Sequence, residues 1–343
     1  MKLPLYHLFI FSGLLLGACQ PKTDQVPLTL EQYHTPLDTG LQQGGVRLIP
    51  IITPSGNFKV WTKTIGNNPR IKVLLLHGGP AGTHEYLECA ESFFPGEGIQ
   101  FVLYDQLGSH FSDQPTDSAL WTIDRFVEEV EQVRQALKMD HTNFYLLGHS
   151  WGGILATEYA LKYQQHLKGL IISNMMSDCI AYDKYAEEVL SKQMPKTVVD
   201  SILKMEADGQ YADPRYMELL MPHFYAKHLC RLDEWPDAVN RSFAHMNSSI
   251  YVLMQGPSEF GISGRLENWN RSSDLAKIKV PTLTIGATHD TMDPEHMNWM
   301  STQLPKGRYL NCPNGSHMAM WDDQLVYFEG LIRFIKDVDQ GKM

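Results

Sequence analysis

The sequence predicts an α/β protein with a doubly wound, mostly parallel sheet and an inserted helical cap. From Gly45 onward, short β-type runs alternate with helical stretches. The later runs are nearly continuous apolar segments, which is typical of strands buried on both faces of a parallel sheet. Between about residues 178 and 264 helix-type segments replace the strand signal, and strands resume at Val280. The alternation indicates the sheet, and its interruption indicates the cap.

The length, composition and net charge of the chain exclude several classes of protein. The chain has 343 residues, of which 43% are hydrophobic and 20% charged, so disorder and coiled coils are excluded. A single core grows to roughly 250–300 residues, so one large domain with an insertion is favoured. The net charge is -10 and no basic run is interleaved with aromatic residues, so we expect no nucleic-acid partner.

The first 42 residues are expected to lie outside the fold. The charged start and the apolar run Leu8–Leu16 have the layout of a signal peptide, and the run is shorter than the about 20 residues of a membrane span. Leu16-Gly17-Ala18-Cys19 resembles a bacterial lipobox, with a plain secretory signal as the alternative. We expect residues 1–18 to be a lipoprotein signal peptide and residues 19–42 a linker after the lipidated Cys19. The protein would then be lipid-anchored to a membrane of the bacterial cell envelope.

Eight runs are predicted as strands, and they divide the chain around the cap. The core is expected to comprise residues 43–177 and 265–343, and the cap residues 178–264. The predicted strands are Val46–Ile52, Phe58–Ile65, Ile71–Leu76, Phe101–Tyr104, Phe144–Leu147, Leu170–Ile172, Thr282–Ile285 and Arg308–Leu310. The predicted cap helices are Tyr182–Lys192, Thr197–Ala207 and Arg215–Leu229.

The four cysteines beyond Cys19 form no CxxC pair, which argues against a zinc or redox motif. In so large a domain we expect them to be buried small hydrophobes rather than disulfide partners. They are Cys89, Cys179, Cys230 and Cys312.

A G-x-S-x-G pattern supplies the strongest chemical signal. Gly148-His149-Ser150-Trp151-Gly152-Gly153 follows a predicted strand and precedes a helix-type run. Glycines flank the serine in a nucleophile elbow because the backbone there is strained and strand and helix approach closely. We therefore expect Ser150 to be a nucleophile in an α/β-hydrolase fold.

The nucleophile needs a histidine base and an orienting carboxylate, which follow it in the order Ser, acid, His. His317 follows the last predicted strand in a turn, and it is preferred over His289 and His296. For the acid, Asp290 lies close to the end of the strand Thr282–Ile285. Its rival Asp293 precedes a proline and is typical of a helix cap, and Asp178 is a third candidate.

Two backbone N–H groups are expected to form the oxyanion hole. One belongs to Trp151, the residue after the nucleophile. The other is expected in His77-Gly78-Gly79-Pro80, after the strand Ile71–Leu76, where adjacent glycines leave the backbone unobstructed. We prefer Gly79 as this donor.

Several segments together resemble the proline iminopeptidase family of α/β-hydrolase serine peptidases, closest to its archaeal tricorn-interacting aminopeptidase branch. They are His77-Gly78-Gly79-Pro80, Asp105-Gln106-Leu107-Gly108-Ser109, the elbow around Ser150, Gly256-Pro257-Ser258-Glu259-Phe260 and Gly315-Ser316-His317-Met318-Ala319-Met320-Trp321. The resemblance implies release of an N-terminal residue, often proline, from short peptides through an acyl-enzyme. Ser150, Asp290 and His317 would be the triad, and Glu259 would bind the substrate's amino group.

The sequence departs from the family pattern at two places. Ala81 follows Pro80 where the family tends to have glycine, and Thr291 follows Asp290 where the related branch usually has a second amine-binding glutamate. Asp293 is a possible substitute for that glutamate. Without the resemblance, Glu259 would be read as an exposed residue of the cap.

The sequence is compatible with three functions. The favoured one is a serine aminopeptidase, the second is an esterase or other hydrolase of a neutral ester or amide, and the third is an inactive binding lipoprotein. A serine at the elbow excludes dehalogenase and epoxide-hydrolase chemistry, which need aspartate there. No metal or organic cofactor is implied.

Four aromatic residues of the predicted cap are candidates for the wall of the substrate site. We expect them to pack in the core of the cap rather than to line the substrate site. These are Tyr225, Trp235, Phe243 and Tyr251.

Overall fold

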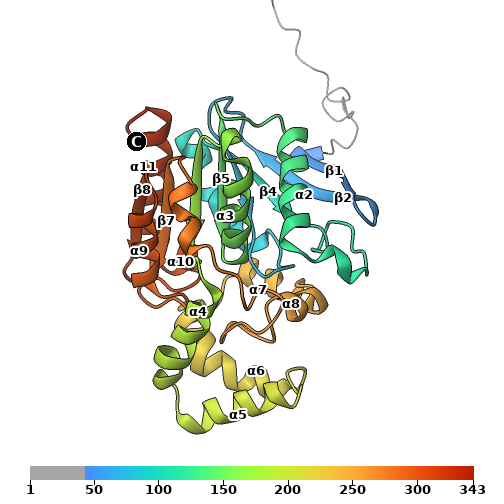
Figure 1. Ribbon diagram of the computed structural model, residues 1–343, viewed down its shortest axis with the longest axis vertical. Helices are drawn as coiled ribbons and strands as arrows, with labels where there is room; N and C mark the ends of the chain where they lie inside the picture. The colour runs from blue at the N-terminus through green and yellow to red at the C-terminus, as the bar shows by residue number, and fades with distance from the viewer. Residues whose placement is uncertain (1–42) are drawn as a thin grey trace, which may run out of the picture.

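The computed structural model describes residues 43–343, which form one sheet flanked by helices and a helical cap at one end (Figure 1). The predicted signal peptide, linker and lipidated Cys19 lie outside the described residues. Eight strands form the sheet in the order β1-β2-β4-β3-β5-β6-β7-β8. They are β1 (Val46–Thr53), β2 (Gly56–Ile65), β3 (Lys72–Leu76), β4 (Gln100–Asp105), β5 (Phe144–His149), β6 (Gly169–Ser173), β7 (Thr282–Ala287) and β8 (Gly307–Cys312).

The strand pairing confirms the predicted mostly parallel sheet. β1 pairs with β2 and β2 with β4 in antiparallel fashion, and the remaining neighbours are parallel. Each predicted run corresponds to one observed strand, with ends that differ by at most two residues. Because the parallel strands share one direction, the loops that follow β3, β5, β6, β7 and β8 meet at one edge of the sheet.

Helices cover both faces of the sheet. The core helices are α2 (Ile123–Ala136), α3 (Trp151–Tyr163), α9 (Pro294–Gln303), α10 (Ala319–Asp322), α11 (Gln324–Asp339) and the 3-10 helix η2 (Glu85–Ser92). One core cluster joins Phe126 of α2, Tyr159 of α3 and Met297 of α9, and a second joins Tyr86 of η2 and Phe334 of α11. Alternate residues of β3 to β6 enter the two clusters, so both faces of these strands are buried.

The cap comprises the helices between β6 and β7. Its main helices are α4 (Cys179–Tyr185), α5 (Lys196–Ala207), α6 (Pro214–Leu220), the π-helical continuation η8 (Met221–Leu229), α7 (Asp237–Ala244) and α8 (Ser248–Met254), and η6 (Ala186–Leu190), η7 (Ser191–Gln193) and η9 (Ser272–Lys277) are shorter segments between β6 and β7. The outer part has its own core, which includes Ile202 of α5 and Phe224 of η8. By contrast, Ile250 and Met254 of α8 belong to a core cluster of the sheet domain. Figure 1 shows α5 and α6 far from the sheet and α7 and α8 close to it.

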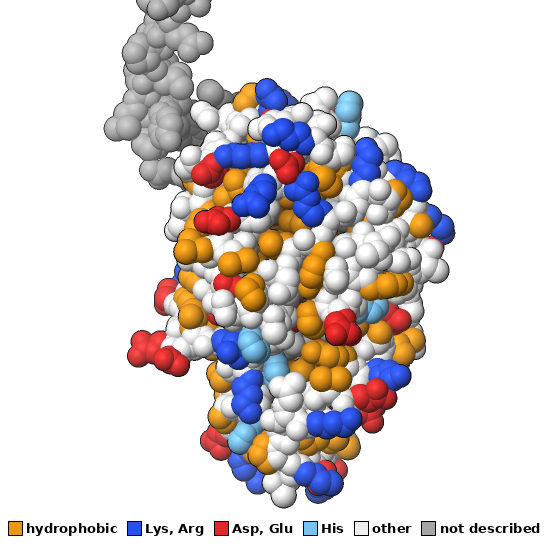
Figure 2. Space-filling view, turned by 90° about the vertical axis from the view of Figure 1, so that its left-hand side faces the viewer, with side chains coloured by type: hydrophobic (Ala, Val, Ile, Leu, Met, Phe, Trp, Pro, Cys, Tyr) orange, Lys and Arg blue, Asp and Glu red, His pale blue; other side chains and the backbone are white. Residues whose placement is uncertain are grey.

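The four cysteines beyond Cys19 are free and buried, which confirms their expected role as small hydrophobes. Within residues 43–343, no helix is both long enough and apolar enough to cross a bilayer. On the face in Figure 2, Lys and Arg side chains are interspersed with Asp and Glu rather than gathered in one patch of a single sign.

Candidate active site

Ser150 occupies a strained turn between β5 and α3. Its backbone angles φ and ψ are 55° and -127°, which lie outside the regions that non-glycine residues ordinarily adopt. The elbow is possible because its neighbours are glycines. A Cβ on Gly152 would lie 2.2 Å from the carbonyl oxygen of Leu76, and one on Gly148 would lie 1.9 Å from that of Gly152. The tight packing of β3, β5 and α3 therefore requires both glycines and holds Ser150 at the sheet edge.

Asp290 and His317 meet at the same edge, in the loops after β7 and β8. Asp290 Oδ1 lies 2.8 Å from His317 Nδ1, and both side chains are almost fully buried. Asn174 Nδ2 donates to Asp290 Oδ2 at 2.6 Å, and the Met292 N–H donates to Oδ1 at 3.1 Å. Burial lowers the pKa of His317, but the nearby carboxylates, Asp290 foremost and then Glu259, together outweigh burial and raise this pKa above its ordinary value.

The alternative candidates take other positions. The Asp293 carboxylate accepts the Glu295 N–H at the start of α9, and the Asp178 carboxylate accepts backbone N–H groups at the start of α4, so both act as helix caps. His296 bonds Ser177 through Nε2 at 3.0 Å. Among the described residues, the carboxylate that contacts the His317 ring is that of Asp290.

Thr291 packs against the triad candidates rather than the cavity beside Ser150. It is fully buried, with Oγ1 at 3.1 Å from His317 Nδ1 and 3.3 Å from Asp290 Oδ1. Neither Thr291 nor Asp293 lines the cavity that contains Ser150. The possibility that Asp293 replaces a second amine-binding carboxylate is therefore wrong, because its carboxylate is committed to the α9 backbone.

Two backbone N–H groups are candidates for the oxyanion hole, one in the loop after β3 and one at the start of α3. Gly79 has a φ of 112°, a conformation that favours glycine, and no acceptor for its N–H is present among the described residues. Trp151 is the first residue of α3, so its N–H has no partner within the helix. A Cβ on Gly78 would lie 2.9 Å from Ser150 Cβ, so the loop touches the serine directly. Both Gly78 and Gly79 line the cavity with Ser150.

Two residues that sequence reasoning missed join the Gly78 loop to His317. The Gly78 N–H donates to Tyr86 Oη at 2.6 Å, and Tyr86 Oη lies 2.8 Å from His149 Nδ1. His149 Nε2 lies 2.8 Å from the His317 carbonyl oxygen. Since a carbonyl only accepts, Nε2 carries the proton, and Nδ1 accepts from the Tyr86 hydroxyl. Burial keeps the pKa of His149 well below its ordinary value, so the ring is neutral.

The sequence contained a partial signal for these residues. His149 is the variable residue inside the elbow pattern, and Asn174 directly follows the buried strand β6 at the same edge as Ser150. Tyr86 lies in a 3-10 helix without a motif, and its position depends on how this helix packs on the sheet.

Glu259 brings a carboxylate from the cap to the same cavity. It is 8% exposed, and its Oε1 accepts from Tyr251 Oη at 2.6 Å. Its backbone is also held by tyrosines: the Tyr182 hydroxyl donates to the Glu259 carbonyl at 2.6 Å, and the Glu259 N–H donates to Tyr225 Oη at 3.3 Å. Burial raises the pKa of Glu259 above its ordinary value, although His317 and Tyr251 oppose the rise. The reading of Glu259 as an exposed cap residue is thus wrong.

The cavity beside Ser150 is small. Its volume is about 30 Å³, room for one or two water molecules. Its walls are Gly78, Gly79, Gly82, Tyr86, His149, Ser150, Leu229, Ser242, Phe243, Met246, Glu259, His317 and Met318. Phe243 was expected to pack only in the cap core, and this was wrong for its position on the cavity wall. Among the described residues, no hydrogen bond joins Ser150 Oγ to His317, as is common in unliganded active sites.

The cap is hydrogen-bonded to the His317 loop. The His317 N–H donates to the His228 carbonyl at 2.9 Å, and the Met318 N–H donates to the Leu229 carbonyl at 2.8 Å. Ser316 Oγ donates to the same Leu229 oxygen at 2.9 Å. The end of η8 thus supports the loop that carries His317.

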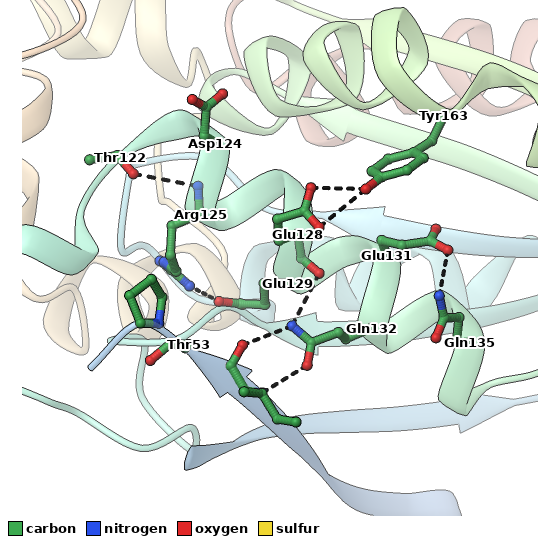
Figure 3. Close-up of a pocket in the computed structure, with 12 residues that line it drawn as sticks. Thr53, Thr122, Asp124, Arg125, Glu128, Glu129, Glu131, Gln132, Gln135 and Tyr163 are labelled. Carbon is green, nitrogen blue, oxygen red and sulfur yellow. Dashed lines mark hydrogen bonds and ion pairs between the residues drawn. The ribbon is translucent and has the colours of Figure 1, made fainter. Parts of the chain in front are cut away.

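A larger hollow of about 840 Å³ lies elsewhere, between α2 and the β1–β2 turn (Figure 3). It shares no lining residue with the Ser150 cavity, and its glutamates are paired with neighbours, as in the pair of Arg125 and Glu129. We therefore place the chemistry in the small cavity, where Ser150, His317 and Glu259 meet.

Comparisons with known proteins agree with this arrangement. A family model described as the alpha/beta hydrolase fold matches residues 72–324. The chain is 62% identical over 296 residues to a proline iminopeptidase of Flavobacterium johnsoniae, covering 86% of this chain and 100% of the relative. It is 64% identical over 294 residues to a proline iminopeptidase of Elizabethkingia meningoseptica, covering 85% and 98%.

A solved structure agrees as well. The crystal structure of proline iminopeptidase from Mycobacterium smegmatis superposes with a TM-score of 0.75 at 26% identity, covering 86% of this chain and 100% of that one. The family model covers most of the sheet domain together with the cap, and the sequence relatives are matched over nearly their whole length. The chain is therefore a hydrolase that belongs to the proline iminopeptidase family of the α/β-hydrolase fold.

Proposed function

We propose that this protein is a serine aminopeptidase that releases an N-terminal proline from short peptides through an acyl-enzyme. The observation that carries the proposal is that one cavity is lined by Ser150, His317 and the buried Glu259. An aminopeptidase needs a nucleophile, a base and an anion for the substrate's ammonium group within one residue's length. The named family relatives supply independent support.

In the first half of the reaction, Ser150 Oγ attacks the carbonyl carbon of the N-terminal residue while His317 Nε2 takes its proton. Asp290 holds the proton on Nδ1 and stabilises the imidazolium that forms. The carbonyl oxygen becomes an oxyanion, which the N–H groups of Gly79 and Trp151 are placed to bind. His317 then gives its proton to the leaving nitrogen, and the peptide bond breaks.

In the second half, water attacks the acyl carbon with His317 as base. The intermediate expels Ser150 Oγ, which regains a proton from His317, and the free amino acid leaves. No step requires a group beyond these residues and water.

Glu259 would recognise the free N-terminus. Its Oε1 already accepts from Tyr251, and Oε2 has no partner among the described residues. A buried carboxylate with one unpaired oxygen is costly, and the ammonium group of an N-terminal proline would neutralise it through a charge-assisted hydrogen bond. An acetylated N-terminus carries no charge and would leave Glu259 unpaired.

The cap must shift before substrate enters. A cavity of about 30 Å³ is too small for a prolyl ring and its carbonyl. The cap contributes Phe243 of α7 and Met246 just after it to the cavity wall, so movement of α7 and the segment that follows would enlarge the cavity.

Tyr86 and His149 would act as positioning residues. Their hydrogen bonds fix the Gly78 peptide at one end and the His317 carbonyl at the other. These partners fix the tautomer of the neutral His149 ring. The hydrogen bonds therefore fix the position of the Gly78 loop relative to His317.

We also propose that the mature chain is anchored through lipid at Cys19, in the bacterial cell envelope. Leu16-Gly17-Ala18-Cys19 supports this placement. Labelling with radioactive fatty acid should mark the wild type and not Cys19→Ala. Absence of label from the wild type would contradict the anchor.

The aminopeptidase is tested with prolyl amide, acetyl-prolyl amide, other aminoacyl amides and a simple ester, with Ser150→Ala as the control for contaminating activity. We expect prolyl amide to be cleaved with the highest kcat/KM and its acetylated form at least 30-fold more slowly, the low end of the about 2–5 kcal/mol for a buried charge left unpaired. Equal cleavage of both amides would instead favour an esterase or general amidase.

A further inference from the structure

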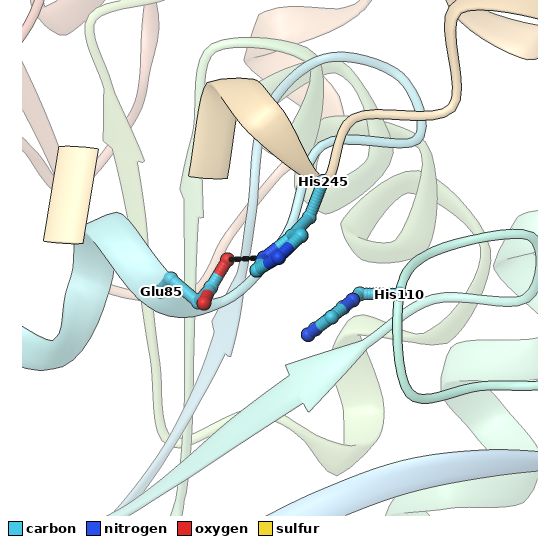
Figure 4. A group of neighbouring side chains, drawn as sticks. All are labelled: Glu85, His110 and His245. Carbon is cyan, nitrogen blue, oxygen red and sulfur yellow. Dashed lines mark hydrogen bonds and ion pairs between the residues drawn. The ribbon is translucent and has the colours of Figure 1, made fainter. Parts of the chain in front are cut away.

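Three side chains outside the proposed catalytic cavity converge at the junction of the cap and the core. Glu85 begins η2, His110 lies in the loop after β4, and His245 directly follows α7 of the cap (Figure 4). Each offers one oxygen or nitrogen atom, and these three atoms all lie within 4.8 Å of one another. Segments that are far apart in the sequence thus bring two imidazoles and a carboxylate together.

Both histidine rings are available as ligands. They stack with centroids 3.9 Å apart and an angle of 9° between their planes. No hydrogen bond to a ring nitrogen of His110 is present among the described residues, and His245 bonds Glu85 Oε2 through Nδ1 at 2.8 Å. The ring nitrogens of His110 are therefore not committed to another described residue.

The surroundings favour a cation. The Arg241 guanidinium contacts the carboxylates of Glu85, Glu88 and Asp237, so three negative groups surround one positive group. Glu85 is 4% exposed at its side chain, whereas His245 is 37% exposed, so an ion can enter from the solvent and meet a fixed buried carboxylate. The Glu85 carboxylate is held in place by contacts with His245, Thr83 and Arg241.

We propose that Glu85, His110 and His245 bind a divalent transition-metal ion, with Zn²⁺ as the expected ion, across the junction of cap and core. Two imidazoles and one carboxylate match the preference of Zn²⁺ for nitrogen and oxygen ligands, and water would complete four-coordination. Ligands of a tetrahedral zinc ion at about 2.0–2.2 Å lie roughly 3.3 Å apart. Because the two imidazole rings are stacked, metal binding would require His110 and His245 to rotate until their nitrogens converge. The ion would then replace the proton between His245 and Glu85.

The ion would inhibit the enzyme by opposing substrate entry, and it would take no part in the chemical steps. The three ligands do not line the Ser150 cavity, whereas Phe243 and Met246, on either side of His245 in the cap, do. Thr83 Oγ1 also joins Glu85 to Ser242 of the cavity wall, through hydrogen bonds of 3.0 and 3.1 Å. A metal that links His245 to Glu85 and His110 would therefore hold the wall closed and oppose substrate entry.

Zinc binding is measured by titration calorimetry on the purified full-length chain in wild type, His110→Ala and His245→Ala. Exposed His141, which is outside the cluster, gives the matched control His141→Ala. We expect one ion that wild type and His141→Ala bind at least tenfold more tightly than either cluster variant. Equal affinity in all four proteins would overturn the site. The same titration on Ser150→Ala should give the wild-type affinity, which makes this result independent of the proposed peptidase activity.

Inhibition by zinc, which rests on the proposed peptidase activity, is tested by assaying prolyl amide hydrolysis with increasing Zn²⁺ and then with excess EDTA. Wild type should lose activity as the ion binds and regain it with EDTA, while His110→Ala and His245→Ala should need at least tenfold more zinc. Without zinc, both variants should stay within threefold of wild type in kcat/KM, because neither side chain lines the Ser150 cavity. Inhibition of both variants at the wild-type zinc concentration would place the ion elsewhere and contradict the proposal.

Discussion

Among the described residues, three carboxylate–histidine pairs are joined at 2.8 Å through Nδ1, and two of these pairs have sharply different surroundings. Asp290 Oδ1 lies 2.8 Å from His317 Nδ1, and Glu85 Oε2 lies 2.8 Å from His245 Nδ1. The first pair is buried on both sides, with side chains 0% and 2% exposed. In the second, the histidine is 37% exposed and the carboxylate is shared with Arg241.

The comparison shows that surroundings, rather than the contact, determine what such a pair can do. Around Asp290 the other donors are neutral, from Asn174, Thr291 and Met292, so His317 is the group whose charge this carboxylate balances. Glu85 instead accepts from a permanent cation, and water reaches His245. We expect the buried pair to control a proton in catalysis, and the exposed pair to link the cap to the core.

The largest expected effect comes from removing the nucleophile or the base. Ser150→Ala and His317→Ala should each lower kcat/KM for prolyl amide by about 10⁴–10⁶-fold, and the double variant should be little worse because the residues act as a unit. His245→Ala is the matched control at the exposed pair, with an expected change below threefold. A comparable loss in His245→Ala would contradict the distinction between the pairs.

Replacement of the acid should be nearly as severe and should change the pH profile. Asp290→Asn is expected to lower kcat by about 10³–10⁴-fold. Because Asp290 raises the pKa of His317, its removal lets burial dominate, so the acid limb of kcat/KM should move to lower pH. Asp293→Asn should keep wild-type activity, since asparagine also caps a helix. If Asp293→Asn were the damaging change, the assignment of the acid would be wrong.

An intermediate effect is expected at Glu259. Glu259→Gln should lower kcat/KM for prolyl amide by about 30- to 100-fold, the low end of the about 2–5 kcal/mol for a buried charge that loses its partner. Hydrolysis of the simple ester should stay within threefold of wild type, because that substrate has no ammonium group. An equal loss on amide and ester would show that the variant disturbs the fold rather than amine recognition.

A smaller effect is expected from the link between the oxyanion loop and His317. Tyr86→Phe leaves the buried Gly78 N–H without an acceptor, which costs about 1–3 kcal/mol. If this cost falls on the transition state, kcat decreases by roughly 5- to 150-fold and KM is unchanged. Tyr163→Phe, whose hydroxyl contacts Glu128 far from the cavity, serves as control. An unchanged kcat in Tyr86→Phe would refute the positioning role.

The smallest change in activity is expected at the exposed pair. Glu85→Gln should lower the free energy of unfolding by about 1 kcal/mol and leave kcat/KM within threefold. The pKa of Glu85 is lowered by folding, so its stabilisation is present above the unfolded pKa and is lost as the pH falls through the folded value. Urea unfolding of both proteins should therefore differ at neutral pH and converge in acid. A difference that persists in acid would contradict this electrostatic origin.

Much of the fold followed from local patterns. Buried strands such as β5 and β6 are apolar on both faces, and this pattern does not depend on the rest of the chain. The elbow glycines at Gly148 and Gly152 were equally predictable, because close approach of backbones excludes a Cβ wherever a strand turns sharply into a helix. The role of Asp293 as the N-cap residue of α9 was predictable from the proline that follows it.

The sequence by itself therefore determined the sheet, the elbow and the order of the residues proposed for the triad, since these depend on neighbours along the chain. Only the tertiary structure decided which distant groups meet. It buried Glu259 among tyrosines, directed Thr291 to His317, joined Tyr86 to His149, and brought His245 of the cap to Glu85 of the core. Such contacts depend on how the cap packs on the sheet, and side-chain packing between remote segments leaves no periodic trace in a single sequence.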